Sequence, residues 1–299
     1  MSAIKPMNLM TNSRLEAHRD HRREWQNFDY AYPVLSRRSK GISVGINLNP
    51  DKVCNFDCVY CEVNRKTPGK RSDISLTQIT QEVEELLDLV ENGLLYEANP
   101  FRDIPLHLRR LNDIAFSGDG EPTTCQEFPL VVQEITNLLK SRNDSKTKLI
   151  LITDSSNLLA PHVINALEIM MANRGEVWLK LDAGTNEYYK EINRTHVPFE
   201  KILHNIERTS QRYPVTIQSL FLRWNGLIPT REEIDSFANH LQRFIRNGSQ
   251  LQALQIYTVA RPTPELNATA LTLKELKLIE KWVLERVPSL PIEIYEGNA

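Results

Sequence analysis

The chain has 299 residues, of which 41% are hydrophobic and 25% are charged, and its formal net charge is −2. This balance allows one large core and does not favour a nucleic-acid-binding or membrane-surface protein. No stretch approaches the ~20 apolar residues of a membrane span, and the first residues lack the apolar region of a secretory signal. We therefore expect a cytoplasmic protein with one domain over residues 1–299, in which residues 1–40 form an N-terminal extension and residues 41–299 the core.

Residues 1–40 are polar and basic, with eight Lys or Arg against four Asp or Glu. The composition favours a solvated arm that packs a few aromatic residues on the core, because short basic runs usually lie on the surface. A role in holding an anionic substrate is the alternative. The aromatic residues of this segment are Trp25, Phe28, Tyr30 and Tyr32.

From residue 42 onward, short apolar runs alternate with segments of helical periodicity. A short apolar run predicts a buried strand, and apolar residues three and four positions apart predict a helix. In chain order, we expect a strand at 42–48, a helix at 75–92, a strand at 113–118, a helix at 128–141, a strand at 148–154, a helix at 161–173, a strand at 176–183, helical structure within 185–213, a strand at 215–224, a helix at 231–247, a strand at 251–260, a helix at 272–287 and a short strand at 291–295.

Repeated strand–helix units with apolar strands indicate a parallel sheet covered by helices. Six or seven units predict an α/β fold with a partial (β/α)6-type barrel of parallel strands, and a doubly wound sheet is the alternative. Capping pairs, Ser75 with Gln78 and Thr272 with Glu275, mark the first turns of two helices. No Gly-x-Gly-x-x-Gly motif follows the first strand, which disfavours a dinucleotide-binding fold.

Polar or Gly-rich segments follow the predicted strands. Parallel α/β folds bind their ligands at the carboxyl ends of the strands. We therefore expect a site where these segments meet on one rim. They are residues 51–63 after the first strand, then 118–124, 153–156, 180–184, 223–226 and 260–262.

Three of the four cysteines, Cys54, Cys58 and Cys61, form a Cys-x-x-x-Cys-x-x-Cys pattern. In a reducing compartment such crowding indicates metal or redox chemistry rather than disulfides. A structural zinc site needs four protein ligands, and Cys125 is the candidate for the fourth. A 4Fe–4S cluster with only three thiolates leaves one iron free for an exchangeable ligand. Cys125 is otherwise interpreted as a small buried hydrophobic residue, or as a hydrogen donor to a substrate radical.

This pattern, with Tyr60 directly before the third cysteine, resembles the signature of the radical SAM (S-adenosylmethionine) superfamily. Residues 45–63 (GINLNPDKVCNFDCVYCEV), 116–123 (FSGDGEPT) and 261–265 (RPTPE) resemble a stand-alone branch of Fe–S oxidoreductases related to the wyosine synthases of tRNA modification. The resemblance runs from about Tyr30 to the end of the chain. It implies a 4Fe–4S cluster on the three cysteines, with S-adenosylmethionine on its free iron. Reductive cleavage of S-adenosylmethionine would give a 5′-deoxyadenosyl radical that abstracts hydrogen from a substrate.

The resemblance also implies which residues contact S-adenosylmethionine. Tyr60 would lie by the adenine, and residues 118–121 match a motif, usually Gly-Gly-Glu-Pro, that holds the methionyl ammonium group. An acidic residue replaces one glycine there, which leaves the ammonium ligand open. Each contact also has a structural alternative. These are packing for Tyr60, a turn for residues 118–121, a helix cap for the serines of 153–156, and an internal ion pair for Lys180 and Asp182. The implied contacts are Tyr60, Gly118, Asp119, Gly120 and Glu121, then Thr153 or Ser155 (with Asp154 and Ser156 nearby) for ribose and carboxylate, Lys180 for the carboxylate and Asp182 for a ribose hydroxyl.

The substrate stays open between a small molecule, a peptide and an RNA base. Residues 37–40 and 64–71 are basic and could contact RNA phosphates, although the net charge does not indicate RNA. The expected partner is a reductant such as a flavodoxin or ferredoxin. Two other functions are a non-catalytic binding module stabilised by zinc or a cluster, and a barrel that binds S-adenosylmethionine without turnover. Further candidate contacts are Gln218, Arg223, Tyr257 and Arg261.

Overall fold

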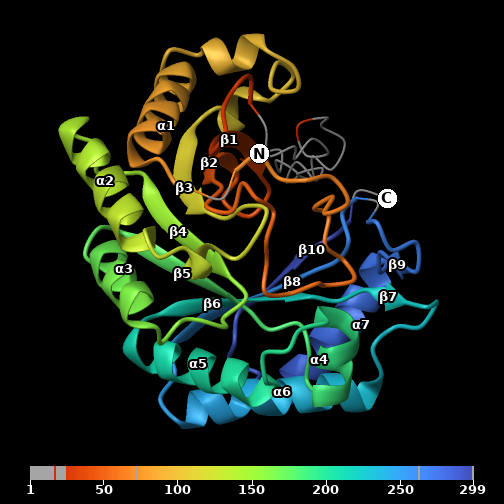
Figure 1. The fold of residues 1–299 in the computed structure, drawn as a ribbon. Coiled ribbons are helices and arrows are strands. Elements are labelled where there is room, and N and C mark those ends of the chain that lie inside the picture. The colour runs from red at the N-terminus through yellow and green to blue at the C-terminus, as the bar shows by residue number, and fades with distance from the viewer. Residues whose placement is uncertain (1–16, 18–24, 72, 262, 298–299) are drawn as a thin grey trace, which may run out of the picture.

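A computed structural model of the chain describes Ala17 and residues 25–71, 73–261 and 263–297, and it is built around a curled eight-stranded sheet (Figure 1). All neighbouring strands run parallel except the first pair, β1 and β2. The predicted α/β partial barrel of parallel strands is therefore confirmed. In spatial order the strands are β1 (Ala31–Ser36), β2 (Gly41–Ile46), β3 (Leu111–Phe116), β4 (Lys148–Thr153), β5 (Gly175–Lys180), β6 (Val215–Leu220), β8 (Leu251–Tyr257) and β10 (Ile292–Tyr295).

Helices follow the outside of the curl (Figure 1). Side chains of alternate strand positions, such as Val44, Ile114 and Leu254, point outward and form one buried core with the apolar faces of the helices. In the described part of the chain, no helix has the length and apolar character needed to cross a membrane. The helices are α1 (Leu76–Glu91), α2 (Phe128–Ser141), α3 (Pro161–Met171), α4 (Asn186–Asn193), α5 (Phe199–Arg212), α6 (Arg231–Arg246) and α7 (Leu273–Leu284).

Two predicted elements are interrupted. The helical segment 185–213 divides into α4 and α5, because Arg194 adopts a left-handed conformation (φ 45°) and Pro198 is the N-cap of α5. The expected strand 215–224 ends at Leu220, and β7 (Arg223–Trp224) pairs instead with β9 (Ala268–Thr269) as a separate two-stranded sheet.

The N-terminal extension contributes β1, a strand that the sequence did not predict. Its Pro33 argues against a strand, since proline cannot donate to a ladder, but β1 is the edge strand of the sheet, where proline is tolerated. The aromatic residues before it pack on the body, with Tyr30 only 1% exposed and Trp25 edge-on to Phe101. Most of residues 1–24 lie outside the described part of the chain.

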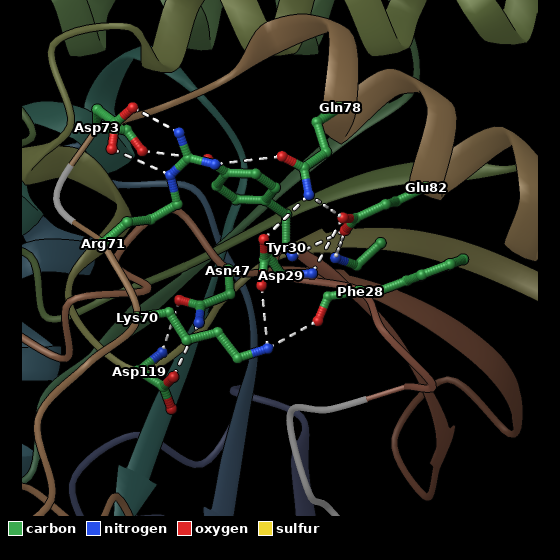
Figure 2. Close-up of polar contacts among 11 residues, drawn as sticks. Phe28, Asp29, Tyr30, Asn47, Lys70, Arg71, Asp73, Gln78, Glu82 and Asp119 are labelled. Atoms are coloured by element: carbon green, nitrogen blue, oxygen red, sulfur yellow. Dashed lines mark hydrogen bonds and ion pairs between the residues drawn. The ribbon is translucent and has the colours of Figure 1, made fainter.

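Helix α1 fastens this extension to the sheet (Figure 2). The buried Glu82 carboxylate accepts hydrogen bonds from the backbone N–H groups of Asp29, Tyr30 and Ala31, at 3.0, 2.8 and 2.9 Å. The side chain of Gln78 donates to Glu82 at 2.8 Å, so it is not the reciprocal half of a capping box, although Ser75 caps the Gln78 N–H as predicted. The predicted capping box at the start of α7 is present in full.

Candidate functional site

The inner face of the curled sheet encloses a cavity of about 350 Å³. The carboxyl-terminal strand ends and the loops that follow them bring distant parts of the sequence to its wall, as the topology predicts. Ten of the twelve residues that the resemblance assigned to the cluster or to S-adenosylmethionine line it: Cys54, Cys58, Tyr60, Cys61, Gly118, Asp119, Gly120, Glu121, Thr153 and Lys180. Ser155 and Asp182 lie outside that wall, although Ser155 directly follows the lining residue Asp154 and Asp182 is two positions after the lining residue Lys180.

The three cysteines lie on a loop that is tied to the end of α4. The Val59 N–H donates to the Ile192 carbonyl at 2.9 Å, and the Cys61 N–H to the Cys58 carbonyl at 2.9 Å. Polar groups also reach two of the sulfurs: Asn193 Nδ2 is 3.5 Å from Cys58 Sγ, and Arg65 Nη2 is 3.5 Å from Cys61 Sγ.

Burial is the largest influence on the pKa of two of these thiols. It raises the pKa of Cys54 to about 11 and the pKa of Cys58 to about 12. Both groups therefore remain protonated at neutral pH unless a metal replaces the proton, because only the thiolate is a metal ligand. The Lys180 ammonium group acts against burial at Cys58 and favours the thiolate there.

The two glycines of the 118–121 segment allow it to pack closely on the cysteine loop and on the end of β2. A Cβ at Gly120 would lie 2.1 Å from the Val53 carbonyl oxygen, next to Cys54, and one at Gly118 would lie 2.2 Å from Asn47 Oδ1. At Gly120 only glycine permits this approach of two backbones.

Asp119, which departs from the family's usual glycine, is engaged with the end of β2. Its N–H donates to Asn47 Oδ1 at 3.0 Å, and Asn47 Nδ2 donates to Asp119 Oδ2 at 2.8 Å (Figure 2). The acidic side chain therefore has a structural partner within the chain.

Glu121 connects the 118–121 segment to the end of β4. Its carboxylate is 3% exposed and accepts hydrogen bonds from the hydroxyls of Thr123 (2.6 Å) and Thr153 (2.7 Å) and from the N–H of Asp154 (2.6 Å). The Thr153 hydroxyl in turn accepts from the Ser155 N–H, and Ser155 Oγ donates to the Lys180 carbonyl at 3.2 Å. These residues thus hold neighbouring strand ends together.

Asp154 presents an unsatisfied carboxylate oxygen at the cavity. Its Oδ1 accepts from the Ser156 N–H at 2.9 Å, whereas its buried Oδ2 has no hydrogen-bond partner among the described residues. Burial, together with the nearby Glu121 carboxylate, raises the pKa of Asp154 well above its usual range. A ligand with a cationic or hydroxyl group would satisfy this oxygen, since a buried polar atom without a partner is costly.

Tyr60, Lys180 and Asp182 form one polar cluster. Tyr60 OH donates to Asp182 Oδ2, and Asp182 Oδ1 accepts from the Leu220 N–H at 2.8 Å. Lys180 Nζ lies 3.4 Å from Asp182 Oδ2, donates to Tyr257 OH at 2.9 Å and lies 4.7 Å from the Tyr60 ring centroid. Burial opposes the ammonium charge most strongly, but Asp182, Tyr257 and Cys58 together outweigh it and raise the pKa of Lys180. Asp182 thus orients Tyr60, and Lys180 faces the cavity.

The remaining sequence candidates divide between the cavity and the periphery. Gln218, Tyr257 and Arg261 line the cavity, whereas Arg223 pairs with Glu275 on α7. Sequence reasoning missed Asp113 and Trp178 as lining residues, because no motif marks them, whereas Arg65 belongs to the basic segment 64–71 that the sequence named for a possible contact with phosphates.

Cys125 lies apart from the other three cysteines. It is 8% exposed, is absent from the cavity wall, and its Sγ donates to Glu127 Oε2 at 3.5 Å. Over residues 25–71, 73–261 and 263–297, no three His, Cys, Asp or Glu side chains are placed to hold one metal ion. The arrangement matches the interpretation of Cys125 as a buried apolar residue.

The chain is similar to known proteins in both sequence and structure. The family model described as "Radical SAM superfamily" matches residues 48–241, about two thirds of the chain. A "UPF0026 protein" of Helicobacter pylori (strain ATCC 700392 / 26695) is 26% identical over 236 residues, which are 77% of this chain and 66% of that protein. The chain therefore spans just under two thirds of the length of this relative.

Two solved structures share the fold. A structure of TYW1 with a lysine-pyruvate adduct bound has a TM-score of 0.51 and 17% identity, covering 81% of this chain and 73% of that one. The crystal structure of Streptococcus suis SuiB bound to S-adenosylmethionine has a TM-score of 0.51 and 12% identity, covering 82% and 46%. At these identities the likeness shows the fold alone.

Proposed function

Because the chain belongs to the radical SAM superfamily, we propose that it is an enzyme whose cavity holds a 4Fe–4S cluster and S-adenosylmethionine. When bound, these cofactors supply a 5′-deoxyadenosyl radical that can abstract hydrogen from a substrate. One observation carries the proposal: the three cysteines line the same cavity as the Gly-rich 118–121 segment and the polar ends of β4 and β5.

The donor set suits the cluster. Three sulfur ligands on one loop match the three thiolates that leave an iron open, and the fourth cysteine lies elsewhere. Positive charge is close to these sulfurs, from Arg65 at Cys61 and from Lys180 near Cys58. It would stabilise the thiolates that iron requires.

The chain's own residues supply complementary groups for S-adenosylmethionine. Lys180 is a cation for the carboxylate, and the unsatisfied oxygen of Asp154 is an acceptor for an ammonium or ribose hydroxyl group. In this assignment Asp182 acts through Tyr60 and Lys180, which it orients, rather than on the ligand. Glu121 likewise acts by holding the end of β4. We also propose a one-electron reductant of the flavodoxin or ferredoxin class as the partner.

The test is anaerobic reconstitution followed by measurement of iron, sulfide, zinc and 5′-deoxyadenosine after addition of dithionite and S-adenosylmethionine. We expect about four irons per chain, as one cubane cluster requires, and formation of 5′-deoxyadenosine. Cys58→Ala should reduce the nucleoside to the level of the buffer, because one cluster ligand is lost.

Cys125→Ala is the matched control, since it removes a buried thiol outside the cavity. It should retain both iron and nucleoside formation. Stoichiometric zinc without 5′-deoxyadenosine would contradict the proposal and favour a zinc-stabilised binding module.

A further inference from the structure

The turn between β1 and β2 brings two arginines to the cavity, opposite the ends of β8 and β10. The guanidinium carbon of Arg38 lies 4.4 Å from the ring centroid of Tyr257 and 5.9 Å from that of Tyr295, and all three side chains line the cavity. Stacking on aromatic rings orients a guanidinium group and leaves its N–H edge free for a planar anion.

Arg38 differs from its arginine neighbours in its partners. Arg261 pairs with Glu62 at 2.5 Å, and Arg37 Nη1 donates to the Glu296 carbonyl at 2.5 Å. Arg38 has no ion pair with a carboxylate anywhere in the described chain, and its Nε is buried without a hydrogen-bond partner there. Burial chiefly, and then the nearby Arg38 and Arg261, lower the pKa of Arg37, whereas Glu62 acts in the opposite direction. Three arginines therefore lie together at this end of the cavity.

We infer that the substrate carries an oxyanion, a phosphate or a carboxylate, which Arg38 binds at the cavity wall between Tyr257 and Tyr295. The guanidinium edge supplies paired N–H donors, the geometry with which arginine recognises both anions. This inference rests on the proposed function in one respect: it takes the molecule that Arg38 binds in the cavity to be the substrate of an enzyme.

The same residues favour a small molecule over RNA. In the basic segment 64–71, two of the cations that could have contacted RNA phosphates are used within the chain, since Lys70 pairs with Asp29 at 3.1 Å and Arg71 with Asp73 at 2.5 Å (Figure 2). Arg38 itself faces the cavity rather than an outer surface. The anion that it binds must therefore enter the cavity.

The inference is tested by calorimetric titration of the reconstituted full chain, saturated with S-adenosylmethionine, against pyrophosphate, succinate and a short single-stranded RNA. We expect pyrophosphate or succinate to bind, and Arg38→Gln to weaken that binding about tenfold, as loss of one charge-assisted hydrogen bond implies. Arg38→Lys should retain part of the affinity. Arg246→Gln, which removes one exposed charge at the end of α6, should leave it unchanged.

Several results would overturn the inference. If Arg38→Gln bound pyrophosphate or succinate as tightly as the natural chain does, the bound anion would be an adventitious ion only. If neither small anion bound to the natural chain, the subsite would be excluded. Binding that disappears when S-adenosylmethionine is present would assign Arg38 to that cofactor's carboxylate instead. RNA binding that exceeds that of the small anions would exclude a small-molecule site. Because none of these readouts requires cleavage of S-adenosylmethionine, Arg38-dependent anion binding without 5′-deoxyadenosine would defeat the proposed function alone.

Discussion

Individual residues on the inner face of the sheet differ in how their charges are satisfied. Glu121 and Asp182 have their oxygens occupied by hydrogen bonds within the chain. Asp154 and Asp113 each keep one buried oxygen without a partner in the described structure. The sequence placed Glu121, Asp154 and Asp182 near one another, because they follow neighbouring strands, but it did not single out Asp113. It could not say which oxygen would be left over, since that depends on tertiary neighbours such as Tyr60.

Asp113, deep on the inner face, should make stability depend on pH. It is 2% exposed, its Oδ1 accepts from Ser43 Oγ, and burial raises its pKa from 3.8 to about 6. The folded state therefore binds the proton more tightly than the unfolded state. Its contribution to stability is full below about pH 4 and is lost as pH rises to about 6.

We expect Asp113→Asn to match the natural chain near pH 4 and to raise the free energy of unfolding by about 2 kcal/mol at pH 7.5, within the range set by a shift of this size. The asparagine oxygen can still accept from Ser43. Urea unfolding across this pH range measures the difference. A difference that does not change with pH would show that the carboxyl does not titrate between the two states.

At the scale of elements, the least predictable piece is the N-terminal extension. Helices α1, α2 and α7 and the parallel strands could be predicted from periodicity and caps. Strand β1 could not be predicted in this way, because Pro33 argues against a strand. Glu82, whose carboxylate binds the backbone at the start of β1, looks in the sequence like an ordinary polar residue of α1. A carboxylate that accepts three backbone N–H groups is visible only after folding.

Glu82→Ala should loosen this extension. It leaves the N–H groups of Asp29, Tyr30 and Ala31 without their acceptor, and we expect the free energy of unfolding to fall by about 3 kcal/mol, since a lost partner for a buried donor costs about 1–3 kcal/mol. Glu85→Ala, on the exposed side of the same helix, should change it by less than about 0.5 kcal/mol.

Urea unfolding gives these free energies, and hydrogen exchange of the β1 amides locates the change. Anion affinity at Arg38 should weaken in Glu82→Ala, because β1 leads into the turn that carries Arg38. Equal stability of the Glu82 and Glu85 variants would show that the extension does not depend on this carboxylate.

Across the whole molecule, the candidate site joins segments that are distant in sequence. The rule that ligands bind at the carboxyl ends of parallel strands predicted that residues 54–61, 118–121, 153–154 and 180 would meet, and they line one cavity. The hydrogen bond from Arg37 to the Glu296 carbonyl, 259 positions away, links the segments that follow the two edge strands β1 and β10 and had no signal in the sequence. Local patterns specify the strand order, whereas that link depends on how far the sheet curls.

A ligand that contacts all these segments should stabilise the fold as a unit. With the cluster in place, S-adenosylmethionine at 100 times its Kd should add about 2.7 kcal/mol to the free energy of unfolding, which is a rise in Tm of about 5 °C for a chain of this size. Thermal unfolding of the anaerobic protein with and without the cofactor measures it. The rise should vanish in Cys58→Ala, because in the proposed function the cofactor would bind the open iron of a cluster that this variant cannot hold. A rise of equal size in that variant would instead support a barrel that binds S-adenosylmethionine through its protein groups alone.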